Sequence, residues 1–167
     1  MRAIDLERLY DYNYWANRRL LAALAPLTPA QFVASVAGSY GSIRNTLVHT
    51  MSAEWGWLER CGGPERGERL KADQYPTIES LTEAWAQVER YMRGFLSQLD
   101  DADLERRITF TLGGGPAQEM ALGDLLQHAA LHAVHHRGQA ALLARELGFA
   151  PGDLDMLMYL ADVPAGH

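Results

Sequence analysis

Apolar side chains recur every three or four positions along several long segments of the chain, a period typical of α-helices that bury one face. The first segment covers residues 4–24, and two prolines follow within the next five residues, where they would end a helix. The second begins after Ser42, whose side chain can cap a helix N-terminus, and fades at Cys61. The first part of the chain therefore predicts two amphipathic helices.

Two further long helices are predicted in the rest of the chain. One starts at Thr77 or Ser80, either of which can act as the N-cap, and its apolar stripe continues to Leu99. The other covers residues 121–147, and Gly148 follows it as the glycine expected just past a helix C-terminus. These segments complete a set of four long helices.

The segments between and after these helices predict smaller features. Residues 61–76 are polar and contain several glycines and prolines, and their length favours a crossover along the molecule over a tight hairpin. Ile108, Phe110 and Leu112 alternate with polar neighbours ahead of the turn sequence GGGP, which predicts a short strand or β-hairpin before the fourth helix. Residues 154–160 are expected to form a short C-terminal helix.

Together these elements predict an all-α fold, with a single domain over residues 1–167 built as a four-helix bundle with a long crossover connection. A chain of 167 residues is long enough to bury a substantial core without disulfides or a structural metal. Of its residues, 48% are apolar and 22% are charged, which is the composition of an ordinary globular protein. Disordered and fibrous classes are therefore excluded.

Charge and composition narrow the classes of partner. The formal net charge of −6 gives no general attraction to nucleic acid or to anionic membranes, so we expect neither as a partner. No apolar stretch approaches the roughly 20 residues needed to cross a bilayer, and the N-terminus lacks the apolar core of a secretory signal.

The single cysteine, Cys61, cannot form an internal disulfide and is interpreted as a loop residue without a chemical role. We therefore expect a cytoplasmic protein.

Four of the six histidines lie in the fourth predicted helix, within the sequence HAALHAVHH. On a helical wheel His132 and His136 fall inside the apolar stripe, so both should point into the bundle. His128 and His135 fall at the polar edge of that stripe and should contact solvent. The helix therefore separates its histidines into an inner and an outer pair.

The spacing of His132 and His136 is that of a metal chelate. Side chains four positions apart on a helix have Cβ atoms about 5–6 Å apart, close enough for both imidazoles to reach one ion. Buried imidazoles without partners would instead cost roughly 1–3 kcal/mol for each unsatisfied group. Hydrogen bonds to hydroxyl or carbonyl groups are the alternative to metal binding, and the spacing alone does not decide between the two.

A third ligand would have to come from another helix. His49 is the remaining histidine in a predicted helix, because His167 is the last residue and should fray. His49 lies away from the apolar stripe of the second helix, on a face that carries Thr46, Ala53 and Gly56. Such small neighbours suit close approach of another helix or exposure to solvent equally, so the periodicity leaves His49 undecided.

Three stretches of the sequence resemble the DinB-like (YfiT-like) family. The sequence HAVHHRGQ is similar to the H-x-x-x-H-R-G-Q signature of that family, YNYWANRRLL to its first-helix motif and LVHTMSAEWGWLER to its second-helix segment. The sequence LDMLMYL near the C-terminus fits as well. The likeness covers nearly the whole chain in the right order.

This resemblance implies a four-helix bundle with a crossover, usually paired into a homodimer, that holds one divalent metal ion with three histidines. Carried over position by position, the ligands are His49, His132 and His136. Leu131 and Leu142 share the polar edge of the fourth helix, where a second subunit would cover them.

Other positions receive interpretations of their own. Arg137 falls on the opposite side of the fourth helix from the ligands, which favours packing or a hydrogen bond to another helix. Gln139 falls close to His132 on the wheel and could orient an imidazole without touching the ion.

Glu54 and Glu146 are interpreted as surface carboxylates. Five aromatic residues are interpreted as packing in the core or at an interface in preference to lining a pocket above the ion: Tyr12, Tyr14, Trp15, Trp55 and Trp57.

Three neutral imidazoles would leave at least one coordination position of a divalent ion open, as in catalytic sites. Zinc or nickel is the expected ion, with iron or manganese as further options. The resemblance implies a metal-dependent transferase of a low-molecular-weight thiol onto electrophilic small molecules, or a hydrolase, with its catalytic residues unassigned. The alternatives are a non-catalytic metal-binding stress-response module, acting by sequestration or by docking a partner, and a bundle whose histidines are only structural.

Overall fold

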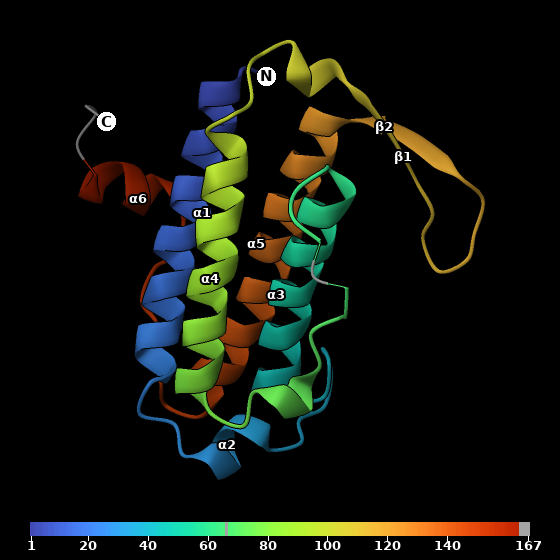
Figure 1. The fold of residues 1–167 in the computed structure, drawn as a ribbon. Coiled ribbons are helices and arrows are strands. Elements are labelled where there is room, and N and C mark those ends of the chain that lie inside the picture. Colours follow the sequence, from blue (N-terminus) through green and yellow to red (C-terminus); the bar gives the residue numbers. More distant parts are fainter. Residues whose placement is uncertain (66, 164–167) are drawn as a thin grey trace.

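Four long helices form the body of the molecule in the computed structural model, which describes residues 1–65 and 67–163 (Figure 1). They are α1 (Ala3–Leu24), α3 (Ile43–Arg60), α4 (Ile78–Leu96) and α5 (Leu122–Glu146). Because α1 and α3 each pack against both α4 and α5, the four helices enclose the core between them. The predicted four-helix bundle is confirmed, and His167 lies outside the described residues.

The predicted crossover is the connection between α3 and α4. These two helices run in the same direction, opposite to α1 and α5, so the chain returns along the length of the bundle between them (Figure 1). In the second half of this return, Leu70 and Tyr75 are buried, and Ala72–Gln74 forms one turn of 3-10 helix. The crossover is therefore packed onto the bundle.

Residues at the helix ends explain where three of the long helices begin or stop. Ser42 accepts a hydrogen bond from the backbone N–H of Asn45 at 3.0 Å and caps α3, as predicted. Of the two candidates for α4, Thr77 is the cap, and it accepts from the backbone N–H of Ser80 at 3.2 Å. Gly148 follows α5 with a φ of +84°, a left-handed conformation that glycine adopts without strain.

The sequence pattern does not predict the short helix α2 (Pro29–Val33), which connects α1 to α3. Pro29 occupies its first turn, where a proline loses no hydrogen bond, and Thr28 caps it by accepting from the backbone N–H of Gln31 at 3.2 Å. The side chain of Phe32 is fully buried. The proline that signals the end of one helix therefore also begins the next.

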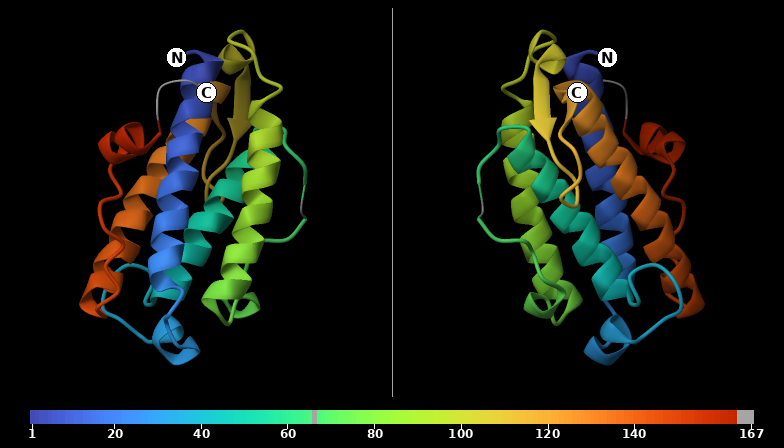
Figure 2. Two further views of the ribbon diagram at one scale, coloured as in Figure 1. Left: turned by 90° about the vertical axis from the view of Figure 1, so that its left-hand side faces the viewer. Right: turned by 90° about the vertical axis from the view of Figure 1, so that its right-hand side faces the viewer.

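A two-stranded antiparallel hairpin precedes α5, as the alternating pattern predicts. Strand β1 (Arg107–Phe110) pairs with β2 (Gln118–Ala121), and Ile108 lies opposite Met120. The hairpin projects from the end of the bundle at which α5 begins, and its loop descends beside the bundle (Figure 2). Leu112 in this loop lines a cavity together with residues of α3.

The predicted C-terminal helix is present as α6 (Met156–Asp162), which packs on the outside of α1. Its Tyr159 ring lies 6.1 Å from the ring of Tyr12 and 5.9 Å from that of Trp15, measured between centroids. These two aromatic residues of α1 are therefore packing residues, as the sequence favoured.

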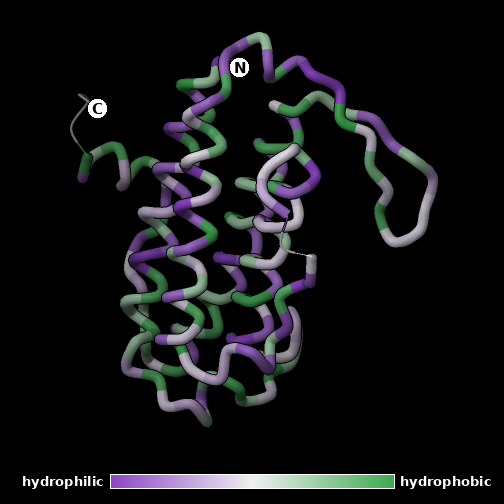
Figure 3. The backbone as a smooth tube through the Cα atoms, viewed as in Figure 1, coloured by the Kyte–Doolittle hydropathy of each residue, from purple (hydrophilic) through white to green (hydrophobic). Residues whose placement is uncertain are grey.

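Hydrophobic and hydrophilic residues alternate along each long helix with the helical period (Figure 3). Leu131 and Leu142 on α5 depart from this rule, since they are 54% and 58% exposed. That a second copy of the chain covers them stays a prediction. Among the described residues, no helix combines the length and apolar character that a membrane span requires.

Candidate metal centre

The imidazoles of His49, His132 and His136 converge between α3 and α5. The Nε2 atom of His132 lies 3.2 Å from Nε2 of His49 and 3.1 Å from Nε2 of His136. One nitrogen of each ring lies within 4.8 Å of those of the other two, an arrangement that could hold a metal ion. The structure thus brings together the three histidines that the family resemblance implied.

Small side chains occur on both helices that carry the three histidines. The face of α5 toward the core carries buried alanines: Ala129, Ala133 and Ala140. On α3, Thr46 is fully buried, whereas Ala53 and Gly56 are half-buried and line a cavity. The small residues near His49 on α3 therefore have two different roles. Thr46 packs in the core, whereas Ala53 and Gly56 leave open space beside the helix.

Gln139 fixes the tautomer of one imidazole. Its Oε1 atom lies 2.8 Å from Nδ1 of His136, and because an amide oxygen only accepts hydrogen bonds, Nδ1 carries the ring proton. Nε2 of His136 is then the nitrogen that faces the other two rings, and in the neutral ring it carries the lone pair. The wheel places Gln139 close to His132, but the structure places it against His136, because residues three apart also meet on a helix.

Burial keeps the other two imidazoles uncharged. Loss of solvation is the main cause that lowers the pKa of His49 to about 4, and electrostatic repulsion from the nearby His136 and Arg69 contributes less. Loss of solvation is also the main cause that lowers the pKa of His132 to about 4, and electrostatic repulsion from His136 and His49 contributes less. Both rings are therefore neutral at pH 7, and each can offer a nitrogen lone pair to a cation.

These donors suit a cation better than they suit a hydrogen-bond network. Nε2 of His132 carries either one proton or one lone pair, so it can form a hydrogen bond with only one of its two close neighbours, Nε2 of His49 or Nε2 of His136. One of the two short nitrogen pairs therefore always lacks a hydrogen bond. Three neutral imidazole nitrogens are, by contrast, a ligand set that zinc and similar divalent ions prefer.

The loop before α3 covers the cluster, and nothing in the periodic pattern pointed to it. Ser39 and Gly41 have positive φ angles of 48° and 80°. The Tyr40 ring stacks on that of His49, with centroids 3.9 Å apart, and its hydroxyl lies 2.9 Å from Nε2 of His49. The Ser39 hydroxyl donates to Oε1 of Gln139 at 2.9 Å. The signal in the sequence was GSYGS, which by itself predicts only a turn.

His128 and His135 are exposed and lie outside the cluster, as the wheel predicts. The ring of His128 packs edge-on against Trp57, with centroids 5.2 Å apart. Nε2 of His135 accepts a hydrogen bond from the amide of Gln139 at 3.2 Å. Neither of these histidines takes the place of one of the three converging residues.

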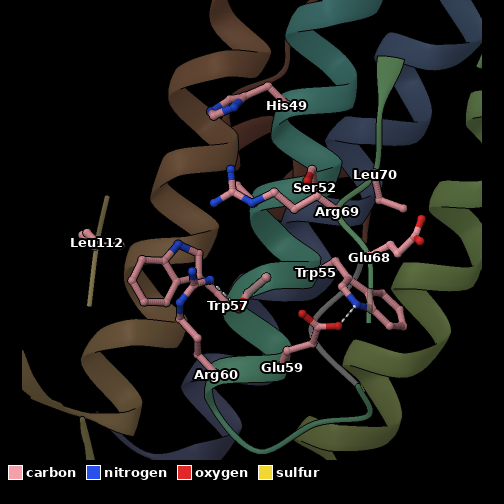
Figure 4. Close-up of a pocket in the computed structure, with 12 residues that line it drawn as sticks. His49, Ser52, Trp55, Trp57, Glu59, Arg60, Glu68, Arg69, Leu70 and Leu112 are labelled. Carbon is pink, nitrogen blue, oxygen red and sulfur yellow. Dashed lines mark hydrogen bonds between the residues drawn. The ribbon is translucent and has the colours of Figure 1, made fainter. Parts of the chain in front are cut away.

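A cavity of about 430 Å³ opens beside His49 and is bordered by Trp55 and Trp57 (Figure 4). Its volume lies within the range of about 300–1,000 Å³ that is typical of ligand pockets. The two tryptophans are 6% and 7% exposed, so they pack in the core as predicted and also border this space. The sequence favoured packing alone for them.

The family to which the chain belongs follows from comparison with known proteins. The model of the DinB family matches residues 2–163. This chain is a member of the DinB family. Protein DinB of Bacillus subtilis (strain 168) is 26% identical over 161 residues, which cover 92% of each of the two chains. The uncharacterized protein YizA of the same organism is 22% identical over 152 residues, 86% of this chain and 89% of its own length.

Solved structures share the DinB fold. The crystal structure of a DinB-like protein from Bacillus cereus ATCC 10987 matches with a TM-score of 0.67 and 20% identity, covering 84% of this chain and 91% of that one. A conserved protein from Enterococcus faecalis matches with a TM-score of 0.57 and 17% identity, covering 87% and 96%. Membership of the DinB family and the three-histidine cluster are compatible with metal binding.

Glu54 of this DinB protein is buried, which corrects its interpretation as a surface carboxylate. It is 2% exposed and accepts hydrogen bonds from the hydroxyl of Tyr14 and, at 3.0 Å, from the indole N–H of Trp85. Glu146, interpreted in the same way, is exposed. Glu54 differs because donors from α1 and α4 satisfy both of its oxygens, which makes burial tolerable.

Loss of solvation raises the pKa of Glu54 from 4.5 to about 7, although the hydrogen bonds from Tyr14 and Trp85 act in the opposite direction. The folded protein therefore binds this proton more tightly than the unfolded chain does. The stability that the protonated carboxyl contributes is fully present below pH 4.5 and is lost as the pH rises through about 7.

Glu54→Gln should remove this pH dependence. Relative to the variant, we expect the free energy of unfolding of the wild-type protein to fall by about 3 kcal/mol over this interval, at about 1.4 kcal/mol for each pH unit. Urea unfolding of both proteins at a series of pH values measures the difference, in which the contributions of the histidines cancel. Parallel pH profiles for the two proteins would contradict the prediction.

Arg137 lies on the side of α5 away from the cluster and is 3% exposed. Its Nη1 atom donates to Oδ1 of Asn13 at 2.7 Å and to Oδ1 of Asn17 at 2.8 Å, both on α1. Of the two roles that the sequence left open for Arg137, packing or a hydrogen bond to another helix, the hydrogen bond is present. It links the helix that carries two of the converging histidines to its neighbour in the bundle.

Cys61 is buried at the C-terminal end of α3, which corrects its interpretation as a loop residue. Loss of solvation raises the pKa of its thiol to about 12, so the thiol stays protonated at neutral pH. The glycines that follow Cys61 suggested a loop, but the side chain itself packs among the core residues of this DinB protein.

Proposed function

We propose that this protein binds one divalent metal ion through the Nε2 atoms of His49, His132 and His136. The observation that carries the proposal is the convergence of three imidazole nitrogens from two helices, with one ring held by Gln139. Zinc or nickel is the expected ion, because imidazole ligands suit both. Iron and manganese are the further candidates.

The composition of the cluster favours an open site over a closed structural one. In the part of the chain that the structure describes, no cysteine, carboxylate or fourth histidine joins the three imidazoles. A divalent ion held there supplies positive charge that lowers the pKa of a coordinated water or thiol. The chain itself orients the ligands: Gln139 holds the His136 ring, and the Tyr40 ring packs over His49.

We further propose that the activity is metal-dependent transfer of a low-molecular-weight thiol to an electrophilic small molecule, with hydrolysis of a small molecule as the related reaction. The cavity beside His49 supports a small-molecule substrate, because it is of ligand size and is lined by one of the three converging imidazoles. The resemblance to thiol-dependent members of the DinB family supports a thiol as the second substrate.

Thiol consumption tests this function. Protein loaded with zinc or nickel is mixed with a haloarene and, in separate reactions, with bacillithiol, mycothiol or glutathione. We expect at least one thiol to disappear faster than in buffer, and removal of the metal with a chelator to return the rate to that of buffer. His136→Ala should behave like the metal-free protein, whereas His128→Ala, which changes an exposed histidine of the same helix, should retain activity.

The same experiment separates an enzyme from a binding module. Rates equal to those in buffer for all three thiols, measured with the ion bound, would reject the transferase. Tight stoichiometric metal binding without turnover is instead the result expected of a non-catalytic metal-binding stress-response module that acts by sequestration or by docking a partner.

A further inference from the structure

The cavity beside His49 extends along α3, between His49 and Leu112 in the loop of the hairpin (Figure 4). Ala53 and Gly56 form part of its wall and leave room because they carry little or no side chain. Apolar surface comes from Trp57 and from Leu112 in the hairpin loop. The space therefore suits the apolar part of a small molecule.

Two guanidinium groups also line this cavity. Arg69, from the crossover, points toward α5 on the same side of α3 as His49, whereas the carboxylate of Glu68 points the other way (Figure 4). Arg60 lies over the Trp57 ring, with its Cζ atom 5.3 Å from the ring centroid. Neither arginine forms an ion pair with a described residue. Nη1 of Arg60 donates to the carbonyl oxygen of Gly56 at 2.8 Å, so Arg69 is the arginine better placed to pair with a ligand.

The remaining carboxylate at the cavity is engaged elsewhere. Glu59 accepts a hydrogen bond from the indole N–H of Trp55 at 2.7 Å (Figure 4). The positive charge of Arg69 is close enough to His49 to help lower the pKa of that imidazole. Arg69 therefore places a positive charge without an ion pair among the described residues at the wall of the cavity, where it can pair with an anion.

We propose that this cavity binds small organic anions, with the carboxylate of the ligand paired to Arg69 and its apolar part held between Trp57 and Leu112. Arginine suits this role because its planar set of donors matches the two oxygens of a carboxylate. The proposal deepens the proposed function and rests on it, since it names the substrate class for the same site. The substrate would be a partly apolar carboxylate whose reacting group lies beside the three histidines.

Binding of phenylacetate, compared with its uncharged analogue phenylacetamide, tests the proposal. Each probe is titrated into metal-free protein, so that no bond from the carboxylate to an ion contributes, and calorimetry gives the dissociation constant. We expect phenylacetate to bind more tightly than phenylacetamide, and Arg69→Gln to weaken phenylacetate binding about tenfold, which corresponds to about 1.4 kcal/mol. Arg90→Gln, which removes an exposed charge from α4, should leave the affinity unchanged.

A second variant changes the shape of the cavity and leaves its charge intact. Ala53→Phe would place a ring in the open space beside α3, and we expect it to abolish phenylacetate binding. Circular dichroism and the metal content of the loaded protein should stay those of the wild type, which would show that the bundle and the three histidines are undisturbed.

Equal binding of the two probes, or equal affinity for phenylacetate in the wild-type protein and Arg69→Gln, would overturn the proposal. Metal binding is measured separately on metal-loaded samples of the same proteins, so neither result bears on the metal site. If the wild-type protein binds the anion but no metal, the proposed function fails and the anion site stands.

Discussion

His136→Ala is expected to abolish stoichiometric binding of zinc or nickel under conditions in which the wild-type protein holds one ion. His136 is the most buried of the three converging histidines, and without it only two imidazoles remain. We expect the metal affinity to fall by more than about a hundredfold. The loss of a residue that only orients a metal ligand already lowers metal affinity by about 10–100-fold, and His136 is itself a proposed ligand. Competition with a chromophoric chelator measures the affinity, and elemental analysis gives the stoichiometry.

Two variants on the same helix serve as references for this result. Gln139→Ala removes the group that orients His136 but leaves every proposed ligand in place, so the affinity should fall by about 10–100-fold. His128→Ala removes an exposed imidazole outside the cluster and should leave the affinity unchanged. A folded His136→Ala protein that binds the ion as tightly as the wild type would show that the ligand assignment is wrong.

The long helices could be predicted from the sequence because each keeps its apolar period over at least 18 residues. The short helix α2 could not, since five residues are too few to show a period. In addition, Pro29 signals both the end of one helix and the first turn of another. Local signals decided the cap of α3 at Ser42 but not that of α4, where Thr77 and Ser80 are chemically equivalent in the sequence.

The metal centre was predictable to a different degree for each of its parts. His132 and His136 share one helix, so their spacing alone selects them as a pair. His49 lies 83 positions from His132 in the chain, and only the packing of α3 against α5 makes them neighbours. The Tyr40 contact depends on a loop with positive φ angles, which no periodic pattern encodes.

Glu54 shows where a general rule fails. The preference of carboxylates for the surface predicts exposure for both Glu54 and Glu146, and it is right only for Glu146. The donors that make burial of Glu54 tolerable, Tyr14 and Trp85, lie on α1 and α4. No pattern within α3 reveals them. Polar contacts between helices are therefore the part of this protein that the periodicity of a single sequence misses.

Arg137→Ala is expected to lower the free energy of unfolding by about 3 kcal/mol or more, because Arg137 belongs to such a contact between helices. Its removal leaves Oδ1 of Asn13 and of Asn17 buried without their donor, and each unsatisfied group costs roughly 1–3 kcal/mol. A cavity between α5 and α1 adds to the loss. Urea unfolding followed by circular dichroism measures it, and Arg90→Ala, at an exposed position of α4, should stay within about 0.5 kcal/mol of the wild type.

Arg137→Met separates the hydrogen bonds from the packing, because methionine fills much of the same space but donates nothing. Burial lowers the pKa of Arg137, which shows that desolvation disfavours the charged guanidinium. Replacing both sides of a buried polar contact by apolar groups can be neutral, but replacing only the donor leaves Asn13 and Asn17 unsatisfied. We therefore expect Arg137→Met to lose more than half of the stability that Arg137→Ala loses. If Arg137→Met is as stable as the wild type, apolar packing alone holds α5 against α1. The same packing would then also set the orientation of α5, and with it the direction in which His132 and His136 point.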